Sequence, residues 1–137
     1  MQEKLLQRFL RYVAVPSQSN AANANVPSSE GQRKLAELLK QDLAELGLVD
    51  LEISEYTGKL PAYLPEGCTK EVPAVGWCAH LDTIDINMSP EIHPQVVKNY
   101  QGGDVCLNKE KDIWIRTAEH PELEKYVGED IVFTDGT

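Results

Sequence analysis

The stretch VPAVGWCAHLDT, residues 72–83, decides how the rest of the sequence is interpreted. Its first part is apolar throughout, which is typical of a β-strand covered on both faces in the middle of an α/β sheet. His80 and Asp82 follow two positions apart, so both side chains can point to the same side if the backbone stays extended. We therefore expect a central strand over 72–79, with this pair at its carboxyl end, the edge at which open α/β sheets bind ligands.

The chemistry of the pair fits a metal site. A neutral imidazole nitrogen is a good zinc ligand, and a nearby carboxylate can accept the other ring N–H, which fixes the tautomer and raises the basicity of the ligand. His80 is thus a candidate metal ligand, and Asp82 is a candidate catalytic residue that orients it. The spacing alone also fits a surface contact at the end of a strand, because such pairs arise by chance in sequences of this composition.

A metal site needs three or four ligands, and the remaining candidates in the sequence are weak. The other histidines, His93 and His120, each precede a proline in loop-like sequence, and neither belongs to a histidine cluster. We interpret both as solvated loop residues, and we interpret Asp85 and Asp104 as turn formers. The chain is therefore expected to hold only part of a site.

Two helices are predicted on the N-terminal side of the central strand. Apolar residues recur at helical spacing over residues 3–14. Ser29 and Gln32 have the spacing of a capping box, and leucines on one face then predict a second helix that ends at Gly47.

Shorter elements complete the predicted order. Strands are expected over residues 48–56 and, interrupted by prolines, over 59–65. Loop-rich sequence follows the central strand, and then come a strand over 112–116, a short helix over 121–127 with proline at its first position, and a strand over 131–134. The order indicates an α/β or α+β fold, for which a three-layer sandwich is the natural arrangement.

The composition argues against several classes of protein. The net charge is −9, from 22 acidic and 13 basic residues, so binding to nucleic acid is not expected. No apolar run approaches the roughly 20 residues that cross a bilayer, and charged residues interrupt the N-terminus, unlike a secretory signal. We expect a cytoplasmic protein with no membrane partner. Cys68, Cys78 and Cys106 lack C-x-x-C spacing and are interpreted as incidental thiols.

The sequence shows no repeats and no internal domain boundary, so residues 1–137 are expected to belong to one domain. The last predicted strand is followed by no element that could cover it, which is unusual for a complete domain. We therefore expect the chain to be a fragment of a longer protein.

The sequence resembles the N-terminal part of the peptidase T family, the tripeptide aminopeptidases of the di-zinc aminopeptidase and aminoacylase superfamily. The resemblance covers essentially the whole chain and is carried by KLLQRFLRYV, VPSSEGQRKLAELLKQDLAELGL, VPAVGWCAHLDT, HPQVVKNYQGGDV and IVFTDGT. The run NYQGGD at residues 99–104 is particular to peptidase T, whereas an apolar strand followed by His-x-Asp-Thr belongs to the broader superfamily.

The resemblance implies that residues 1–137 are the N-terminal portion of a three-layer α/β/α zinc-peptidase catalytic domain with a mixed, largely parallel sheet. It implies that His80 is a ligand to one of two zinc ions and that Asp82 orients the His80 imidazole. In the family the other ligands come later, among them a bridging aspartate in a Gly-Ala-Asp-Asp motif, and this sequence contains none of them. The lid domain, through which the complete enzyme is expected to form a homodimer, is also absent.

The activity implied for the complete protein is hydrolysis of tripeptides with release of the N-terminal residue. The 137-residue chain alone is expected to lack this activity and to bind zinc weakly or not at all, because one imidazole cannot complete a zinc site. One alternative is a related di-zinc deacylase or carboxypeptidase, because His-x-Asp-Thr does not determine the substrate. Another is a non-catalytic α/β binding module in which His80 and Asp82 are surface residues. Exposed strand edges in a fragment would favour self-association.

Overall fold

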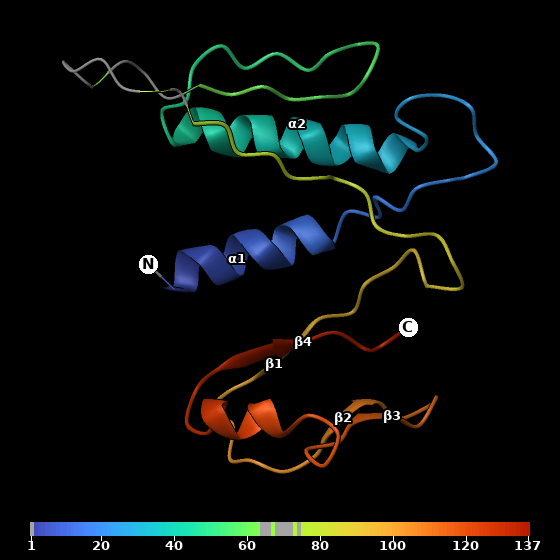
Figure 1. Ribbon diagram of the computed structural model, residues 1–137, viewed down its shortest axis with the longest axis vertical. Coiled ribbons are helices and arrows are strands. Elements are labelled where there is room, and N and C mark those ends of the chain that lie inside the picture. The colour runs from blue at the N-terminus through green and yellow to red at the C-terminus, as the bar shows by residue number, and fades with distance from the viewer. Residues whose placement is uncertain (1, 64–66, 68–72, 74) are drawn as a thin grey trace. The chain divides into compact units, whose positions relative to one another are not determined.

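The computed structural model describes residues 2–63, 67, 73 and 75–137 (Figure 1). The chain divides into two compact units, one formed by Met1–Ala14 with Glu91–Thr137 and the other by Val15–Pro90. The elements follow in the order α1 (Gln2–Val13), α2 (Glu30–Glu45), β1 (Gln95–Val97), β2 (Val105–Asn108), β3 (Ile113–Ile115), the 3-10 helix η1 (Pro121–Tyr126) and β4 (Ile131–Phe133). Helix and strand are mixed, as predicted. Neither α-helix in the described part of the chain has the length and apolar character needed to cross a membrane.

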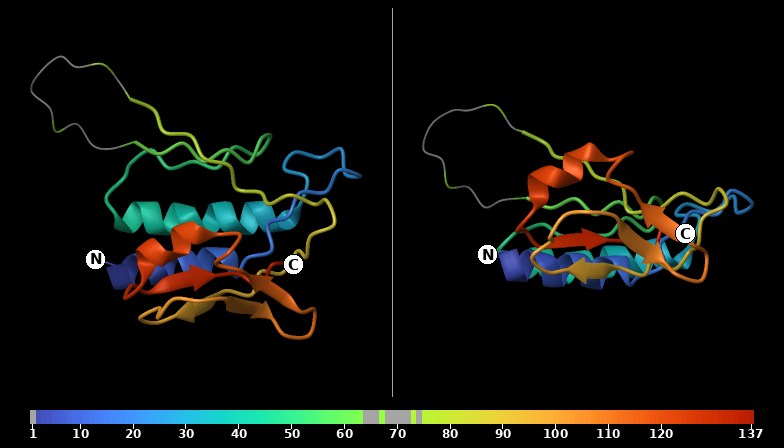
Figure 2. Two further views of the ribbon diagram at one scale, coloured as in Figure 1. Left: turned by 60° about the horizontal axis from the view of Figure 1, so that its bottom comes forward. Right: turned by 90° about the horizontal axis from the view of Figure 1, so that it is seen from below.

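The first unit contains two short antiparallel ladders (Figure 2). β1 pairs with β4, with Gln95 opposite Phe133, and β2 pairs with β3, with Val105 opposite Ile115. The strands β3 and β4 and the helix η1 confirm the predicted elements, and α1 confirms the first predicted helix. β1 and β2 lie in sequence that was predicted to be loop-rich, because strands of three or four residues are too short to show a periodic pattern.

Tyr100 lies at the centre of the small core of this unit. Its side chain is 3% exposed and packs with the buried residues Leu123 and Phe133. Its main chain accepts from Gly128 N–H at 2.7 Å and donates to Glu129 at 2.8 Å, and its hydroxyl donates to the carbonyl of Gly103. The NYQGGD run therefore fastens the segment after η1 to the segment after β1.

α2 is the main element of the second unit and confirms the second predicted helix. It buries Leu35 and Ala36. The predicted capping box at its start is wrong. The Ser29 hydroxyl is buried and has no hydrogen-bond partner among the described residues, and the Gln32 amide donates instead to Ser28 Oγ at 3.3 Å.

The strands predicted over 48–56 and 59–65 reduce to one bridge. Val49 and Tyr63 exchange main-chain hydrogen bonds of 2.8 and 3.1 Å, and no longer ladder forms in the described part of these segments; residues 64 and 65 lie outside it. Arg33 of α2 donates to the carbonyl of Glu55 at 2.6 Å and holds this loop to the helix. The strand prediction failed because the segment forms a solvent-exposed loop on α2, and its alternating apolar residues do not line a buried face.

The predicted central strand over 72–79 is also not formed in its described residues. Residues 72 and 74 lie outside the described part of the chain, and residues 75–79 are exposed, with Trp77 at 96%. A strand buried on both faces needs a hydrogen-bonding neighbour at each edge, and no described strand pairs with this segment. The sheets among the described residues are two-stranded and antiparallel, so the three-layer, largely parallel sandwich stays a prediction.

Candidate functional site

His80 and Asp82 contact each other directly. His80 Nδ1 lies 2.7 Å from the Asp82 main-chain carbonyl oxygen and 3.2 Å from Asp82 Oδ1. A carbonyl oxygen can only accept a hydrogen bond, so Nδ1 must donate and carries the proton in the neutral ring. The lone pair of the neutral imidazole is then on Nε2.

Nothing in the described part of the chain hydrogen-bonds to Nε2 of His80, and the His80 side chain is 84% exposed. A neutral imidazole with one nitrogen held by a protein oxygen and the other presenting a lone pair is the form in which histidine binds metals. The arrangement is therefore suited to a single metal–nitrogen bond. The arrangement arises from a local contact between His80 and Asp82, rather than from side chains that alternate along a strand.

The chain directly after Asp82 is anchored to the segment that follows α1. Thr83 forms a parallel bridge with Gln18, and its carbonyl accepts from the Ser19 main chain at 2.9 Å and from the Ser19 hydroxyl at 3.1 Å. The Gln18 amide donates to the carbonyls of Ile84 and Met88 at 3.0 and 3.1 Å. These contacts position the carboxyl side of the His-x-Asp pair. Nothing in the spacing of the sequence pointed to Gln18 and Ser19, because their partners lie far along the chain.

Asp85 contributes to the same anchor. Its Oδ2 accepts from the Ala21 main chain at 2.9 Å. The carboxylate therefore joins two segments that are distant in sequence, instead of shaping its own turn as predicted.

The other predicted loop residues are engaged in the first unit. His93 Nδ1 lies 2.9 Å from Asp135 Oδ2, and His120 Nδ1 lies 3.1 Å from Glu122 Oε1. His93 is exposed, as predicted, whereas His120 is half-buried, and both have carboxylate partners.

Asp104 accepts three hydrogen bonds. The donors are the main chain and hydroxyl of Thr117, at 2.8 and 3.1 Å, and Arg116 Nη1 at 3.0 Å. The main-chain hydrogen bond from Thr117, followed by the bond from Arg116, lowers the pKa of Asp104. Asp104 thus joins the start of β2 to the end of β3, a role wider than the predicted turn.

The described residues do not assemble a complete metal site. No group of three or more His, Cys, Asp or Glu side chains among them is placed to hold an ion, and zinc requires three or four ligands. His80 fits as one ligand by its tautomer and exposure, but the set around it is incomplete. Cys78 is exposed and Cys106 half-buried, both as free thiols, and Cys68 lies outside the described residues.

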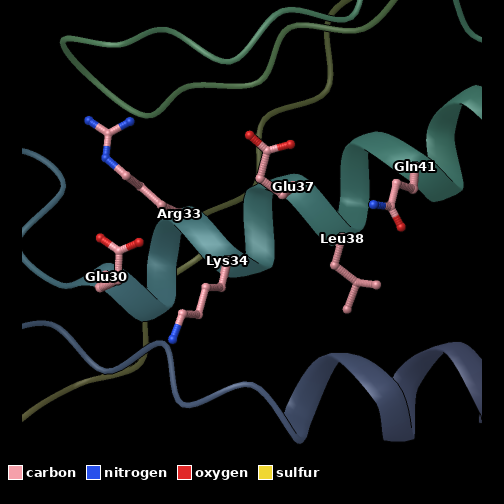
Figure 3. A pocket seen from close by; sticks show the side chains of 6 residues that line it. All are labelled: Glu30, Arg33, Lys34, Glu37, Leu38 and Gln41. Atoms are coloured by element: carbon pink, nitrogen blue, oxygen red, sulfur yellow. The ribbon is translucent and has the colours of Figure 1, made fainter.

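A shallow hollow runs along α2 and does not resemble a substrate site (Figure 3). Its lining is mostly charged and comes from one helix: Glu30, Arg33, Lys34, Glu37, Leu38 and Gln41. The side chains are spread along the helix rather than converging on one point, and neither His80 nor Asp82 lines the hollow.

The chain is similar over its whole length to several curated proteins. No protein-family model matches the chain. The chain is 46% identical over 140 residues to a peptidase T-like protein of Yersinia pestis, and 42% identical over 137 residues to a peptidase T-like protein of Rhizobium meliloti and to peptidase T of Listeria welshimeri. Each match covers 100% of this chain and 33% of the relative, so the chain spans about a third of their length. The resemblance predicted from the sequence is thereby confirmed: over its whole length, this chain is a homologue of proteins named peptidase T and peptidase T-like protein.

Proposed function

We propose that the chain is part of a zinc-dependent aminopeptidase that releases the N-terminal residue of tripeptides. The observation that carries this proposal is identity of 42–46% to peptidase T and peptidase T-like proteins across the whole chain. We further propose a cytoplasmic location and, for the complete protein, a homodimer.

The role proposed for this chain is to supply one metal ligand. His80 would bind through Nε2, while the main-chain carbonyl and carboxylate of Asp82 hold Nδ1–H in place. In such a site, a bound zinc ion would polarise the substrate carbonyl and lower the pKa of a bound water. The remaining ligands and the general base would come from sequence outside these 137 residues.

The main test uses the complete protein and tripeptide hydrolysis. His80→Ala is expected to lower kcat/KM by at least about 100-fold, because it removes a ligand, whereas replacing a residue that only orients a ligand typically costs about 10- to 100-fold. Zinc content after dialysis should fall in parallel. His120→Ala, which removes another histidine, with a side chain 46% exposed, is the matched control and should keep both properties. Full activity and zinc content in His80→Ala would overturn the proposal.

Two further experiments on the complete protein test the alternative functions. A panel of tripeptides, dipeptides and acylated amino acids distinguishes an aminopeptidase from a related di-zinc deacylase or carboxypeptidase. Zinc titration with and without His80→Ala tests the non-catalytic binding module, for which the affinity would not change. The 137-residue chain by itself is expected to hydrolyse no tripeptide, and measurable hydrolysis by it would contradict the proposed division of ligands.

A further inference from the structure

The peptide unit between Asp82 and Thr83 connects His80 to a distant segment of the chain. Its carbonyl oxygen, from Asp82, accepts from His80 Nδ1 at 2.7 Å, and its N–H, from Thr83, donates to the Ser17 carbonyl at 3.4 Å. Peptide units outside X–Pro bonds are planar and almost always trans, so their C=O and N–H groups point in opposite directions. Holding the N–H on Ser17 therefore aims the carbonyl at the His80 ring.

The next peptide unit is held by the same segment. The Thr83 carbonyl accepts from the Ser19 main chain at 2.9 Å and from the Ser19 hydroxyl at 3.1 Å. Thr83 thus lies opposite Gln18 in a parallel bridge, with a main-chain hydrogen bond on each side. A rotation of the unit between Asp82 and Thr83 would strain these bonds, so the bridge limits the directions in which the Asp82 carbonyl can point.

The Gln18 side chain extends this hold along the chain. Its amide nitrogen donates to the carbonyls of Ile84 and Met88 at 3.0 and 3.1 Å. An amide nitrogen carries two hydrogens, so it can make both bonds at once. Residues 84–88 belong to no helix or strand of the described chain, so hydrogen bonds from a side chain restrict a segment that lacks a ladder of its own.

The segment that accepts from Thr83 is itself supported by α2. Ser17 is 5% exposed. Gly31, in the first turn of α2, approaches this segment so closely that a Cβ there would lie 1.7 Å from the Pro16 carbonyl oxygen and 3.2 Å from Ser17 Cα. The hydrogen bonds around Thr83 are therefore made to main chain that packs against a helix.

We propose that Gln18 and Ser19 are positioning residues for His80. They hold the main chain at Thr83, and the Asp82 carbonyl then keeps the proton of the neutral ring on Nδ1 and leaves Nε2 free to bind a metal ion. This role in metal binding rests on the function proposed above for His80. Both residues act through the peptide unit between Asp82 and Thr83, unlike the Asp82 carboxylate, which contacts the ring directly at 3.2 Å.

Nitrogen-15 NMR of the His80 ring tests the positioning in the metal-free 137-residue chain. The spectra are recorded at about pH 8.5, above the range in which histidine ordinarily changes charge. Gln18→Met combined with Ser19→Ala removes both bonds of the Gln18 amide and the bond of the Ser19 hydroxyl. We expect the ring to change from mostly Nδ1–H to a mixture of both tautomers, because it is 84% exposed and either nitrogen can then donate to water. The change should be larger when Asp82→Ala also removes the carboxylate.

Two further variants distinguish positioning from a general loss of structure. Arg33→Met removes another bond from a side chain to a distant main-chain carbonyl, that of Glu55, and should leave the tautomer unchanged. Ser19→Thr keeps a hydroxyl and should behave as the unaltered chain. The proposal is overturned by an unchanged Nδ1–H ring when Gln18→Met, Ser19→Ala and Asp82→Ala are combined, or by an equal redistribution in Arg33→Met. If the combined variant does not fold, Gln18→Met and Ser19→Ala, each measured alone, decide.

Zinc affinity of the complete protein separates this proposal from the function proposed above. Gln18→Met with Ser19→Ala should weaken zinc binding and lower kcat/KM by about 10-fold, near the lower limit for the loss of an orienting partner. If His80→Ala loses zinc and the Gln18 and Ser19 variant binds it as tightly as the unaltered protein, the positioning role fails and the proposed function stands. If His80→Ala keeps its zinc, the proposed function fails, and the ring measurement still decides whether Gln18 and Ser19 hold the tautomer.

Discussion

At the scale of the residue, the main chain of Asp82 matters as much as its carboxylate. The sequence suggested that the carboxylate orients His80, but the carbonyl oxygen is nearer to Nδ1, at 2.7 Å against 3.2 Å. A side-chain substitution leaves the carbonyl in place. The structure therefore divides the orienting role between two groups of one residue.

This division predicts the outcome of Asp82→Ala. We expect the His80 ring to keep its proton on Nδ1, because the carbonyl still accepts it, and in the complete protein we expect an activity loss near the lower limit of about 10-fold for a lost orienting partner. Nitrogen-15 NMR of the ring reports the tautomer directly. A shift of the proton to Nε2 in Asp82→Ala would contradict the assignment.

Gly31 is the second residue with a sharp prediction. A Cβ at this position would lie 1.7 Å from the carbonyl oxygen of Pro16. Alanine is favoured over glycine in a helix by about 1 kcal/mol, but an overlap with main-chain atoms typically costs about 1–3 kcal/mol and requires the backbone to move. We therefore expect Gly31→Ala to lower the free energy of unfolding, as measured by urea denaturation.

Gly76 provides the matched control, because a Cβ there would meet no atom of the described residues within 4 Å. Gly76→Ala should leave the urea midpoint within experimental error. Gain of stability in Gly31→Ala would show that α2 does not pack closely on Pro16.

At the scale of the element, the start of α2 distinguishes two neighbouring serines. Ser28 Oγ accepts from the Asn20 main chain at 3.0 Å and from Gln32 at 3.3 Å, whereas Ser29 Oγ is buried with no partner in the part of the chain that the structure describes. Ser28→Ala should lower the free energy of unfolding by about 0.5–1.5 kcal/mol per lost hydrogen bond. Ser29→Ala should be neutral or stabilising. If Ser29 capped the helix, its replacement would instead lower the free energy of unfolding by about 1 kcal/mol. Thermal denaturation of both variants therefore shows whether Ser29 caps α2.

The β2–β3 pair carries a pH-dependent contribution from Asp104. Its pKa is lowered, chiefly by the main-chain hydrogen bond from Thr117, so its stabilising effect is present above the unfolded value of about 3.9 and is lost as the pH falls through the folded value. Asp104→Ala should therefore lower the melting temperature at neutral pH, and the difference should shrink below about pH 4. Glu110→Ala, at an exposed position before β3, is the control and should show no such difference. A constant difference at every pH would refute the ionic origin.

The elements that the sequence predicted share a local signal. α1 and α2 show helical spacing, η1 has proline at its first position, and β3 and β4 are short runs of β-branched and aromatic residues. β1 and β2 carry too few residues for a pattern. The segment over 72–79 has a strong pattern but no described strand beside it, because pairing depends on residues elsewhere.

At the scale of the whole molecule, the second unit exposes several large apolar side chains. Val75, Trp77 and Ile86 are 78%, 96% and 66% exposed. Exposed large apolar side chains favour association, so we expect concentration-dependent self-association of the 137-residue chain by light scattering. Trp77→Lys should reduce it, whereas Tyr56→Lys, at an exposed ring outside this segment, should have less effect. A monomer at high concentration would contradict this expectation.

The candidate site shows the same limit of sequence reasoning. His80 and Asp82 were identified because their relation is local, and their contact is observed. Gln18 and Ser19, which hold the following residues, could not be identified, since their hydrogen bonds connect segments separated by more than sixty residues.

The two ladders of the first unit also imply an order of assembly. β2 and β3 are joined by a short turn, whereas β1 and β4 must close a loop that contains that whole hairpin and η1. The entropy lost on closing a loop grows with its length, and non-local pairings form slowly for that reason. The β2–β3 hairpin should therefore fold first, which shortens the flexible loop that remains to be closed when β4 pairs with β1.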